Sequence, residues 1–412
     1  MLKSLRDHLD NKIKPHFEKG GNLEKFYALY DAIDTFLYVP NTTSKSGVHI
    51  HDASDTKRTM SLVIIALMPA LLFGMYNVGY QHYQAIGQVP LFWDCFLFGL
   101  LAILPKIIIS YIVGLGIEII IAQIKGHEVH EGFLVSGMLI PMIVPVDLPL
   151  WMLAVATAFA VVFAKEVFGG TGYNIFNVAL VARAFLFFAY PSKMTGEHVF
   201  VRIDNSFGIG DSHVIDGITQ TVDAFSGATP LSQLETATSS NITLVDITGH
   251  ALNYWDMFFG LIPGSIGETS KLAILLGAII MIVFGVASWK TIVSVFVGGM
   301  ATALLINQFA VNAVMQVTPL EHILLGGFAF GAVFMATDPV TSARTESGKW
   351  VYGFFIGVIA ILIRVFNPGY PEGMMLAILF MNAFAPLIDY VVVGKNIKRR
   401  MRRSAKKTDI GL

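Results

Sequence analysis

Cysteine is almost absent from this sequence, which limits the chemistry that the chain can perform by itself. A single cysteine, Cys95, in 412 residues excludes an intrachain disulfide, a metal centre built from several cysteines and a self-contained iron–sulfur cluster. If the protein moves electrons, the carriers must therefore be organic molecules or lie in other subunits.

Charge is also scarce. Charged residues make up 14% and hydrophobic residues 54% of the chain, whereas a soluble domain carries roughly 25% charged residues. This composition indicates an integral membrane protein. The net charge of -1 gives no indication of partners, and we expect no nucleic acid among them. Because residues 1–58 are polar and charged, we expect no cleavable signal peptide.

Apolar runs that are long enough to cross a bilayer, about 20 residues each, follow one another from residue 60. The third run contains Pro141 and Pro145, and the eighth contains Gly326 and Gly327, so both are predicted to be broken helices. Broken helices are tolerated at membrane depth only where they are buried in protein or line a cavity. The ten predicted spans lie at 60–80, 93–123, 133–146, 149–167, 175–191, 271–288, 291–309, 321–337, 350–366 and 373–393.

The first five spans resemble the last five in order, since each set has a broken third span. Five is an odd number, so the two halves must be inverted, and paired broken helices in inverted halves indicate a central binding site. The alternative is chance similarity between apolar segments. We predict an all-α fold of ten transmembrane helices in two inverted five-helix repeats, like that of urea and ammonium transporters. The predicted parts are an arm (1–58), a first repeat (59–191), a polar segment (192–270), a second repeat (271–394) and a basic tail (395–412).

Lysine and arginine in short loops predict the orientation. The loops near 81–92, 146–149 and 367–372 carry none, as expected of loops outside the cytoplasm. Both termini are then cytoplasmic, in a bacterial inner membrane, and segment 192–270 is periplasmic. The inner side carries Lys125, Lys165, Lys290, Arg344, Lys349 and the basic tail.

The polar segment contains the stretch Asp223-Ala224-Phe225-Ser226-Gly227-Ala228-Thr229-Pro230. One interpretation is a turn, because small residues let the backbone bend and Pro230 disfavours a helical Thr229. The other is that small neighbours present the Thr229 hydroxyl as an acceptor for a phosphoester.

A second glycine-rich segment, Lys165-Glu166-Val167-Phe168-Gly169-Gly170-Thr171-Gly172-Tyr173-Asn174-Ile175-Phe176-Asn177, joins spans four and five. Two asparagines three residues apart would share one helical face and offer paired donors and acceptors to a planar heteroaromatic ligand. The alternative is a tight turn capped by Asn174. Because no strand precedes the glycines, a Rossmann or Walker site is excluded.

Ionisable residues inside spans are functional-site hypotheses, because each is costly to insert in a bilayer. Glu118 and Asp389 lie near cytoplasmic ends and could instead reach the interface, while Asp338 could cap a helix break. Carboxylates that face a cavity would suit sodium, which prefers oxygen ligands. The full set is Glu118, Arg183, Asp338, Arg364 and Asp389, joined by Lys106 if span two is one helix.

Five motifs, in order, resemble the membrane subunit designated B of the sodium-translocating NADH:quinone reductase, a family related to the subunit designated D of the Rnf complex. Two of them are the 223–229 and 165–172 stretches quoted above. The others are Ile262-Pro263-Gly264-Ser265-Ile266-Gly267-Glu268, Ala336-Thr337-Asp338-Pro339-Val340 and Tyr370-Pro371-Glu372-Gly373-Met374-Met375. The resemblance runs from about residue 15 to residue 403, and the polar N-terminal arm favours the quinone reductase over Rnf.

The resemblance implies two flavins. A separate flavin transferase would join FMN through its phosphate to Thr229, with Asp223 helping recognition and Ser226, Gly227 and Ala228 flanking the acceptor. A non-covalent riboflavin would contact Asn174 and Asn177 within the membrane. Val178 departs from the family pattern, which usually has proline after Asn177.

The resemblance also implies a quinone and an ion. Ubiquinone would be reduced near Gly114, Phe185 and Phe187, and sodium would pass Glu118, Asp338 and Asp389. The chain would then be a translocase subunit, working with a second subunit that carries covalent FMN and with an NADH-oxidising subunit that holds FAD and an iron–sulfur cluster. The alternatives are an Rnf subunit, linked to ferredoxin and NAD, and a secondary transporter or channel without redox chemistry.

Overall fold

The computed structural model describes residues 14–17, 30, 46–48, 56–125, 132–195, 199–202, 227–235, 243–367, 369 and 372–408. Asp223, Ser226 and most of the N-terminal arm lie outside the described residues, so the predictions made for them stay predictions.

The described part of the chain is helical, apart from one isolated antiparallel bridge between Val245 and Ala251. The first half contains α2 (Lys14–Phe17), α4 (Thr56–Ala85), α5 (Phe92–Lys125), α6 (Phe133–Met142), α7 (Leu150–Ala160), η3 (Val161–Lys165), η4 (Glu166–Phe168), α8 (Val178–Ala189) and α9 (Pro191–Met194). The polar segment contains α10 (Pro230–Glu235) and α11 (Tyr254–Phe259). The second half contains α12 (Lys271–Val283), α13 (Trp289–Asn307), α14 (Ala313–Gln316), α15 (Pro319–Leu324), α16 (Phe328–Phe330), η5 (Gly331–Met335), α17 (Glu346–Phe366) and α18 (Met374–Thr408).

Six of the ten predicted spans are helices long and apolar enough to cross a membrane: Arg58–Ala85, Phe92–Lys125, Leu150–Phe168, Trp289–Asn307, Glu346–Phe366 and Met374–Ser404. The third, fifth and sixth spans correspond to shorter apolar helices, α6, α8 and α12, of 10, 12 and 13 residues. The eighth span is broken into α15, α16 and the π-helix η5. The chain is therefore a multi-pass membrane protein whose described secondary structure is helical, apart from the isolated bridge.

Local chemistry explains why two spans are shorter than predicted. The Asn177 side chain caps α8, accepting the N–H groups of Ala179 at 3.1 Å and Leu180 at 3.3 Å, so this helix begins after the predicted position. Helix α12 ends before Gly285, which has a positive φ of 72° that favours glycine.

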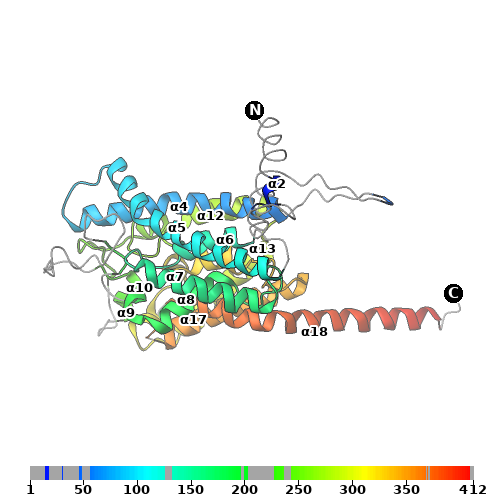
Figure 1. Ribbon diagram of the computed structural model, residues 1–412. Coiled ribbons are helices and arrows are strands. Elements are labelled where there is room, and N and C mark those ends of the chain that lie inside the picture. Colours follow the sequence, from blue (N-terminus) through cyan, green and yellow to red (C-terminus); the bar gives the residue numbers. More distant parts are fainter. Residues whose placement is uncertain are drawn as a thin grey trace.

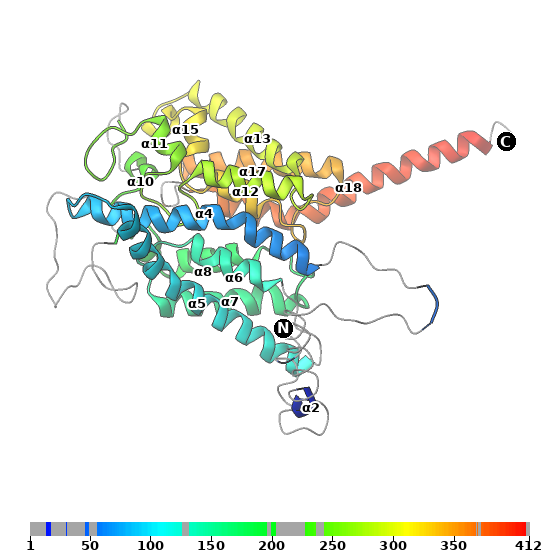
Figure 2. The same cartoon turned by 90° about the horizontal axis from the view of Figure 1, so that it is seen from above.

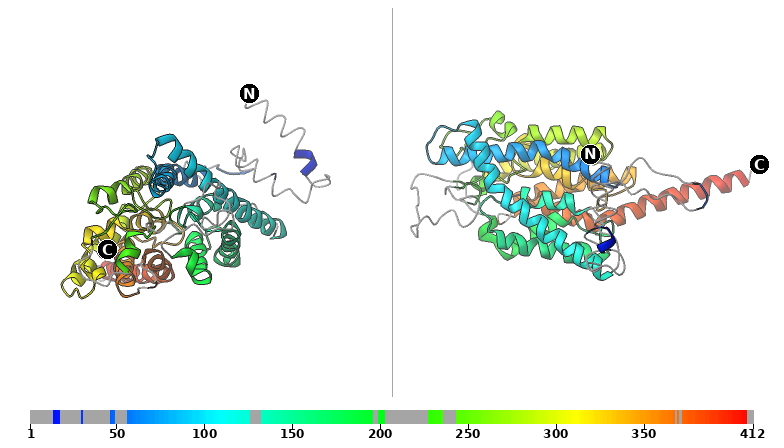
Figure 3. Two further views of the ribbon diagram at one scale, coloured as in Figure 1. Left: turned by 90° about the vertical axis from the view of Figure 1, so that its left-hand side faces the viewer. Right: turned by 45° about the horizontal axis from the view of Figure 1, so that its top comes forward.

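The long helices run side by side along one axis (Figures 1 and 2), seen end-on in the left view of Figure 3. Helix α4 packs against α5 and α12, and α17 packs between α13 and α18. Helices α10 and α11 lie at one end of the bundle, whereas α4 begins at the other end, from which α18 projects.

Three buried cations bind the backbone carbonyls of the broken segments. Lys106 donates to the Pro145 carbonyl at 2.9 Å and to the neighbouring Val146 carbonyl. Lys271 donates to the carbonyls of Glu268 at 2.6 Å, Thr269 at 3.3 Å and Gly326 at 3.1 Å, and Arg364 to those of His322 at 2.6 Å and Leu325 at 3.3 Å. Carbonyls at irregular backbone need such partners where water is absent. Lys106 and Arg364 therefore have a structural role.

Arg183, the ionisable residue of the fifth predicted span, ties α8 to two loops of the other half. Its guanidinium donates to Glu268 at 2.6 Å and also pairs with Glu372. The side chains of Arg183 and Glu268 are each 3% exposed. Removing one partner of a buried ion pair is strongly destabilising, by about 3–5 kcal/mol, because it leaves an unpaired buried charge.

Replacing Arg183 by methionine is expected to lower the thermal unfolding midpoint of the purified subunit, because Glu268 loses its cation. Adding Glu268→Gln to Arg183→Met is expected to restore part of the loss. Unfolding is followed with a thiol-reactive dye, since the single cysteine, Cys95, is fully buried. The control is Lys290→Met, which breaks an exposed pair with Glu346 and is expected to leave the midpoint nearly unchanged. If the double variant lost as much in unfolding midpoint as the two single variants together, the pairing of Arg183 with Glu268 would be contradicted.

Candidate functional site

Thr229 immediately precedes α10 and caps it. The Thr229 hydroxyl oxygen accepts the Ser232 N–H at 3.2 Å, and its carbonyl accepts the Gln233 N–H at 3.0 Å. Gly227 and Ala228 are buried, whereas Thr229 is half-buried. The described end of the stretch, residues 227–230, is thus the N-terminal cap and first residue of a helix.

Three sequence motifs meet at Thr229. A shallow cavity is lined by Thr229, by Ser265 and Glu268 of the 262–268 motif, by Gly326 of the broken eighth span and by Glu372 of the 370–375 motif. The Arg183 ion pairs involve the same two glutamates. Residues from the polar segment and from the second half therefore surround Thr229, and Arg183 connects two of them to the first half.

Two sets of contacts hold the Thr229 segment in place. The Gln233 side chain donates to the carbonyls of Ala228 at 3.2 Å and Val245 at 2.8 Å, and accepts the Val245 N–H at 3.0 Å. Beneath α10 an apolar cluster joins it to α11 and α15 through Leu231, Leu234, Met257, Val317, Leu324 and Leu325.

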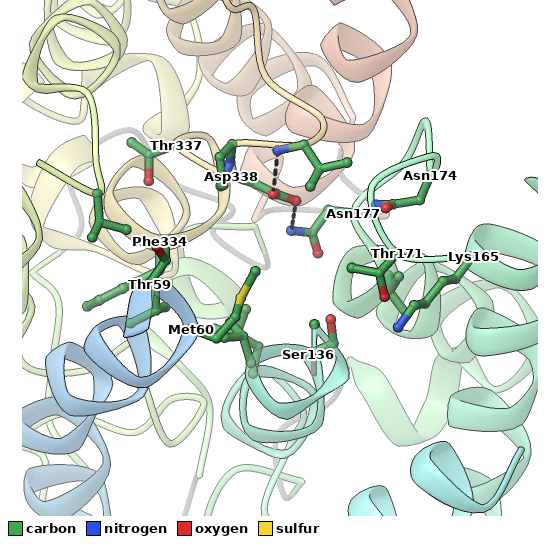
Figure 4. A pocket seen from close by; sticks show the side chains of 18 of the residues that line it. Thr59, Met60, Ser136, Lys165, Thr171, Asn174, Asn177, Phe334, Thr337 and Asp338 are labelled. Carbon is green, nitrogen blue, oxygen red and sulfur yellow. Dashed lines mark hydrogen bonds between the residues drawn. The ribbon is translucent and has the colours of Figure 1, made fainter. Parts of the chain in front are cut away.

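A second, larger cavity of about 710 Å³, including its mouth, lies where the two halves meet (Figure 4). Thr59 and Met60 line it from the start of α4, so it lies towards the end of the bundle opposite to α10. Its walls are apolar, from Met60, Val63, Leu139, Met281 and Phe334, and its polar groups come from Ser136, Lys165, Thr171, Asn174, Asn177, Thr337 and Asp338.

Both predicted asparagines line this cavity, but not as the sequence analysis expected. They do not share a helical face, because Asn174 lies in a turn and Asn177 is the cap of α8. The Asn174 amide donates to the Phe176 carbonyl at 3.1 Å, and the Asn177 amide donates to Asp338 at 3.2 Å. Val178 is the first residue of α8, a position that suits proline as well, so this departure does not disturb the helix start.

Asp338 both lines the cavity and closes the break after η5. Its carboxylate accepts the Val340 N–H at 3.0 Å and the Thr341 hydroxyl at 3.0 Å, besides the Asn177 amide. The contact with Asn177 joins residues 161 positions apart in the sequence. Asp338 therefore connects the two halves at the cavity.

Glu118 does not extend to the surface. It is 4% exposed and forms a buried ion pair with Lys165, whose ammonium lies 5.8 Å from the centroid of the Phe133 ring. Its other carboxylate oxygen, Oε2, and the buried hydroxyl of Thr171 have no hydrogen-bond partner among the residues that the structure describes. Buried polar atoms without partners are uncommon, and here they lie at or beside the cavity.

Asp389 is placed differently. Its carboxylate accepts the N–H groups of Arg344 at 2.8 Å and Thr345 at 3.0 Å, and the Thr345 hydroxyl at 2.6 Å, which fixes the start of α17. It does not line the larger cavity. Within the described ranges no three His, Cys, Asp or Glu side chains gather as a metal site, so the structure does not assemble the sodium candidates into one site.

The three quinone candidates lie on two helices. Gly114 faces the Phe133 ring so closely that an added Cβ would lie 1.9 Å from it, and Glu118 follows one turn later on the same face of α5. On α8, Phe185 stacks on Phe159 at 4.6 Å and Phe187 meets Phe188 edge-on. The structure joins Gly114 with Glu118 but gives the two phenylalanines other partners.

Two residues near the cavity were missed by the sequence analysis. The buried Tyr352 hydroxyl lies 2.7 Å from the Asn382 amide, and with that amide oriented to satisfy its neighbours its oxygen accepts the Asn177 N–H at 3.2 Å. Both are neutral polar residues inside apolar spans, whereas the candidates chosen from the sequence of the spans were ionisable residues. The sequence feature that could have indicated this contact is the amide residue Asn382 within the tenth predicted span.

Comparison with known proteins supports the family that the five sequence motifs resemble. The profile of the NQR2, RnfD, RnfE family matches residues 43–398. The chain is 44% identical over 425 aligned positions to the subunit designated B of the Na(+)-translocating NADH-quinone reductase of Pseudomonas aeruginosa PAO1, covering 97% of this chain and 99% of the relative. The corresponding proteins of Chromohalobacter salexigens and Klebsiella pneumoniae strain 342, which have the same name, are also 44% identical, over 97% and 96% of this chain and 97% and 99% of the relatives. The chain therefore belongs to the NQR2, RnfD, RnfE family.

Proposed function

We propose that this chain is the membrane subunit of a sodium-pumping NADH:ubiquinone oxidoreductase, carrying covalent FMN on Thr229 and riboflavin in the larger cavity, and passing electrons to ubiquinone coupled to sodium export. The observation that carries the proposal is the grouping of the motifs. Three surround Thr229 and two surround the larger cavity, at opposite ends of the bundle. Relatives over nearly the whole length are named for the quinone reductase, which favours it over an Rnf subunit.

Thr229 suits a covalent attachment. The residue is half-buried and lines a cavity, its preceding neighbours Gly227 and Ala228 are small, and Gln233 holds the backbone at Ala228. An unactivated threonine is a poor nucleophile, and no described basic side chain contacts Thr229 Oγ1. A separate transferase therefore fits better than self-modification.

The larger cavity suits a planar heteroaromatic molecule. Its lining is mostly apolar with a few placed polar groups, as in small-molecule sites. Asn174, Asn177 and Thr171 would meet the polar edge of the ring system, and Lys165 would place a positive charge beside it. Bound flavins supply the redox chemistry, while the protein sets their position and electrostatic surroundings.

We extend the proposal to the topology: ten membrane segments in two inverted repeats, both termini in the cytoplasm of a bacterial cell, and Thr229 on the periplasmic side. The packing order supports the repeats, because α5, α7 and α8 contact one another in sequence as α13, α17 and α18 do. Helix α4, first in its half, packs against α12, first in the other. The proposed partners are the flavin transferase, a second covalent-FMN subunit and an NADH-oxidising subunit with FAD and an iron–sulfur cluster.

Thr229→Ala is expected to abolish the flavin fluorescence of the denatured subunit, because the phosphoester needs the hydroxyl. The chain is produced with the transferase, run on a denaturing gel and viewed under ultraviolet light. The control is Thr269→Val, which changes another threonine of the same cavity and should stay fluorescent. A dark wild-type band or a fluorescent Thr229→Ala band would defeat the proposal and favour a transporter without redox chemistry.

Asn177→Leu is expected to weaken retention of the non-covalent flavin at least about tenfold, which corresponds to 1.4 kcal/mol, because the cavity loses an amide and its link to Asp338. The purified complex is denatured and filtered, and free flavin in the filtrate is measured against flavin on the chain. The control, Asn253→Ala, removes another helix-capping asparagine, at α11. Full riboflavin content in Asn177→Leu would show that the cavity is not its site.

Glu118→Ala and Asp389→Ala are both expected to reduce sodium-stimulated turnover more than flavin content, if these carboxylates border the sodium path. Both changes should also lower stability, since Glu118 pairs with the buried Lys165 and Asp389 holds the start of α17. Turnover is measured over a range of sodium concentrations, with the exposed Glu346→Ala as the control. An unchanged sodium dependence in Glu118→Ala would remove that residue from the path.

A further inference from the structure

The C-terminal part of α18 stands away from the rest of the protein. The helix runs without interruption from Met374 to Thr408, and Figures 1 and 2 show its last turns extending straight beyond the bundle. Every residue from Lys395 to Ser404 is exposed. This part of the helix therefore has no contact with the described remainder of the chain that would bury it.

One face of the projecting helix is strongly basic. At 3.6 residues per turn, the cations occupy one broad face, and like charges meet at spacings of three and four residues, as in Lys395 with Arg399 and Arg399 with Arg403. No acidic residue occurs between Tyr390 and Thr408 to balance them. Such pairs destabilise a solvated helix, so the helix would gain from an acidic partner. The exposed cations are Lys395, Lys398, Arg399, Arg400, Arg402 and Arg403.

The opposite face is narrow and apolar. Val393, Ile397 and Met401 follow one another at intervals of four residues, and their side chains are 45%, 50% and 59% exposed. A helix that needs only to keep the cytoplasmic side positive requires neither an apolar stripe nor a rigid extension. The surface of another protein could bury a helix of this kind, in which a basic face lies beside a small apolar stripe.

The direction of the helix argues against the membrane surface as its main partner. From Gly394 to Ser404 the helix rises roughly 15 Å, whereas charges in solution are screened beyond about 8–10 Å. Because α18 is straight, its extension carries Arg399, Arg402 and Arg403 away from the lipid headgroups, which would lie near the end of the span. An amphipathic helix that binds membranes lies in the plane of the interface.

We propose that residues 395–404 of α18 form a docking surface for an acidic face of another subunit of the same complex, at the end of the bundle from which α18 projects. The cations pair with carboxylates of that subunit, and Ile397 and Met401 enter an apolar contact beside them. This inference rests on the proposed membership in a multi-subunit complex, but not on either flavin.

The test uses the whole complex in its native membrane. A photo-reactive amino acid replaces Met401, and irradiation is expected to link this chain to another subunit. The triple variant Arg399→Glu, Arg402→Glu and Arg403→Glu is then purified with increasing salt, and is expected to retain that subunit at least about tenfold less than wild type, because like charges would face each other. The matched control replaces the same three arginines by lysine and is expected to retain it.

Two outcomes would overturn the docking surface. One is crosslinking to lipid alone, with loss of binding to anionic vesicles in the triple variant, which would assign the helix to the membrane surface. The other is full subunit content in the triple variant at every salt concentration. Flavin fluorescence on Thr229 is recorded in the same samples, so that a failure of this proposal is distinguished from a failure of the proposed function.

Discussion

Irregular backbone inside an apolar bundle must find partners for its carbonyl groups, and the rest of this structure depends on how it does so. Lys106, Lys271 and Arg364 are buried and donate to carbonyls of the broken segments. Burial of a cation is costly unless its donors are satisfied, and here the carbonyls satisfy them. The eighth, broken span supplies Gly326 to the Thr229 cavity and ends at Asp338, which lines the larger one. The segment before α12, held by Lys271, supplies Ser265 and Glu268.

The larger cavity lies where the first half of the chain meets the second, whereas the Thr229 cavity is connected to the first half through Arg183. At the Thr229 end, Arg183 joins α8 to Glu268 and Glu372, and at the other end Asn177, the first residue before α8, joins Asp338. One short helix therefore carries a contact to each site, with the amide contact just before its start and the ion pair at its middle. Interactions at a junction between halves position ligands most rigidly when both partners are themselves buried.

The sequence predicted the features that depend on local pattern. Apolar runs located α4, α5, α13 and α17, and proline and glycine located the breaks. It could not supply the partners of Arg183, because Glu268 and Glu372 are 85 and 189 residues away. The helical-face argument for Asn174 and Asn177 was wrong because glycines with positive φ turn the chain between η4 and α8. Asn382 escaped notice because its importance comes from a contact across the bundle.

A density map of the native complex, purified with its flavins, tests the account most directly. The account predicts planar density in the cavity between Lys165, Asn177 and Asp338, and separate density continuous with the Thr229 side chain at the opposite end of the bundle. A cavity filled only by lipid or by rearranged side chains, with no density extending from Thr229, would contradict it.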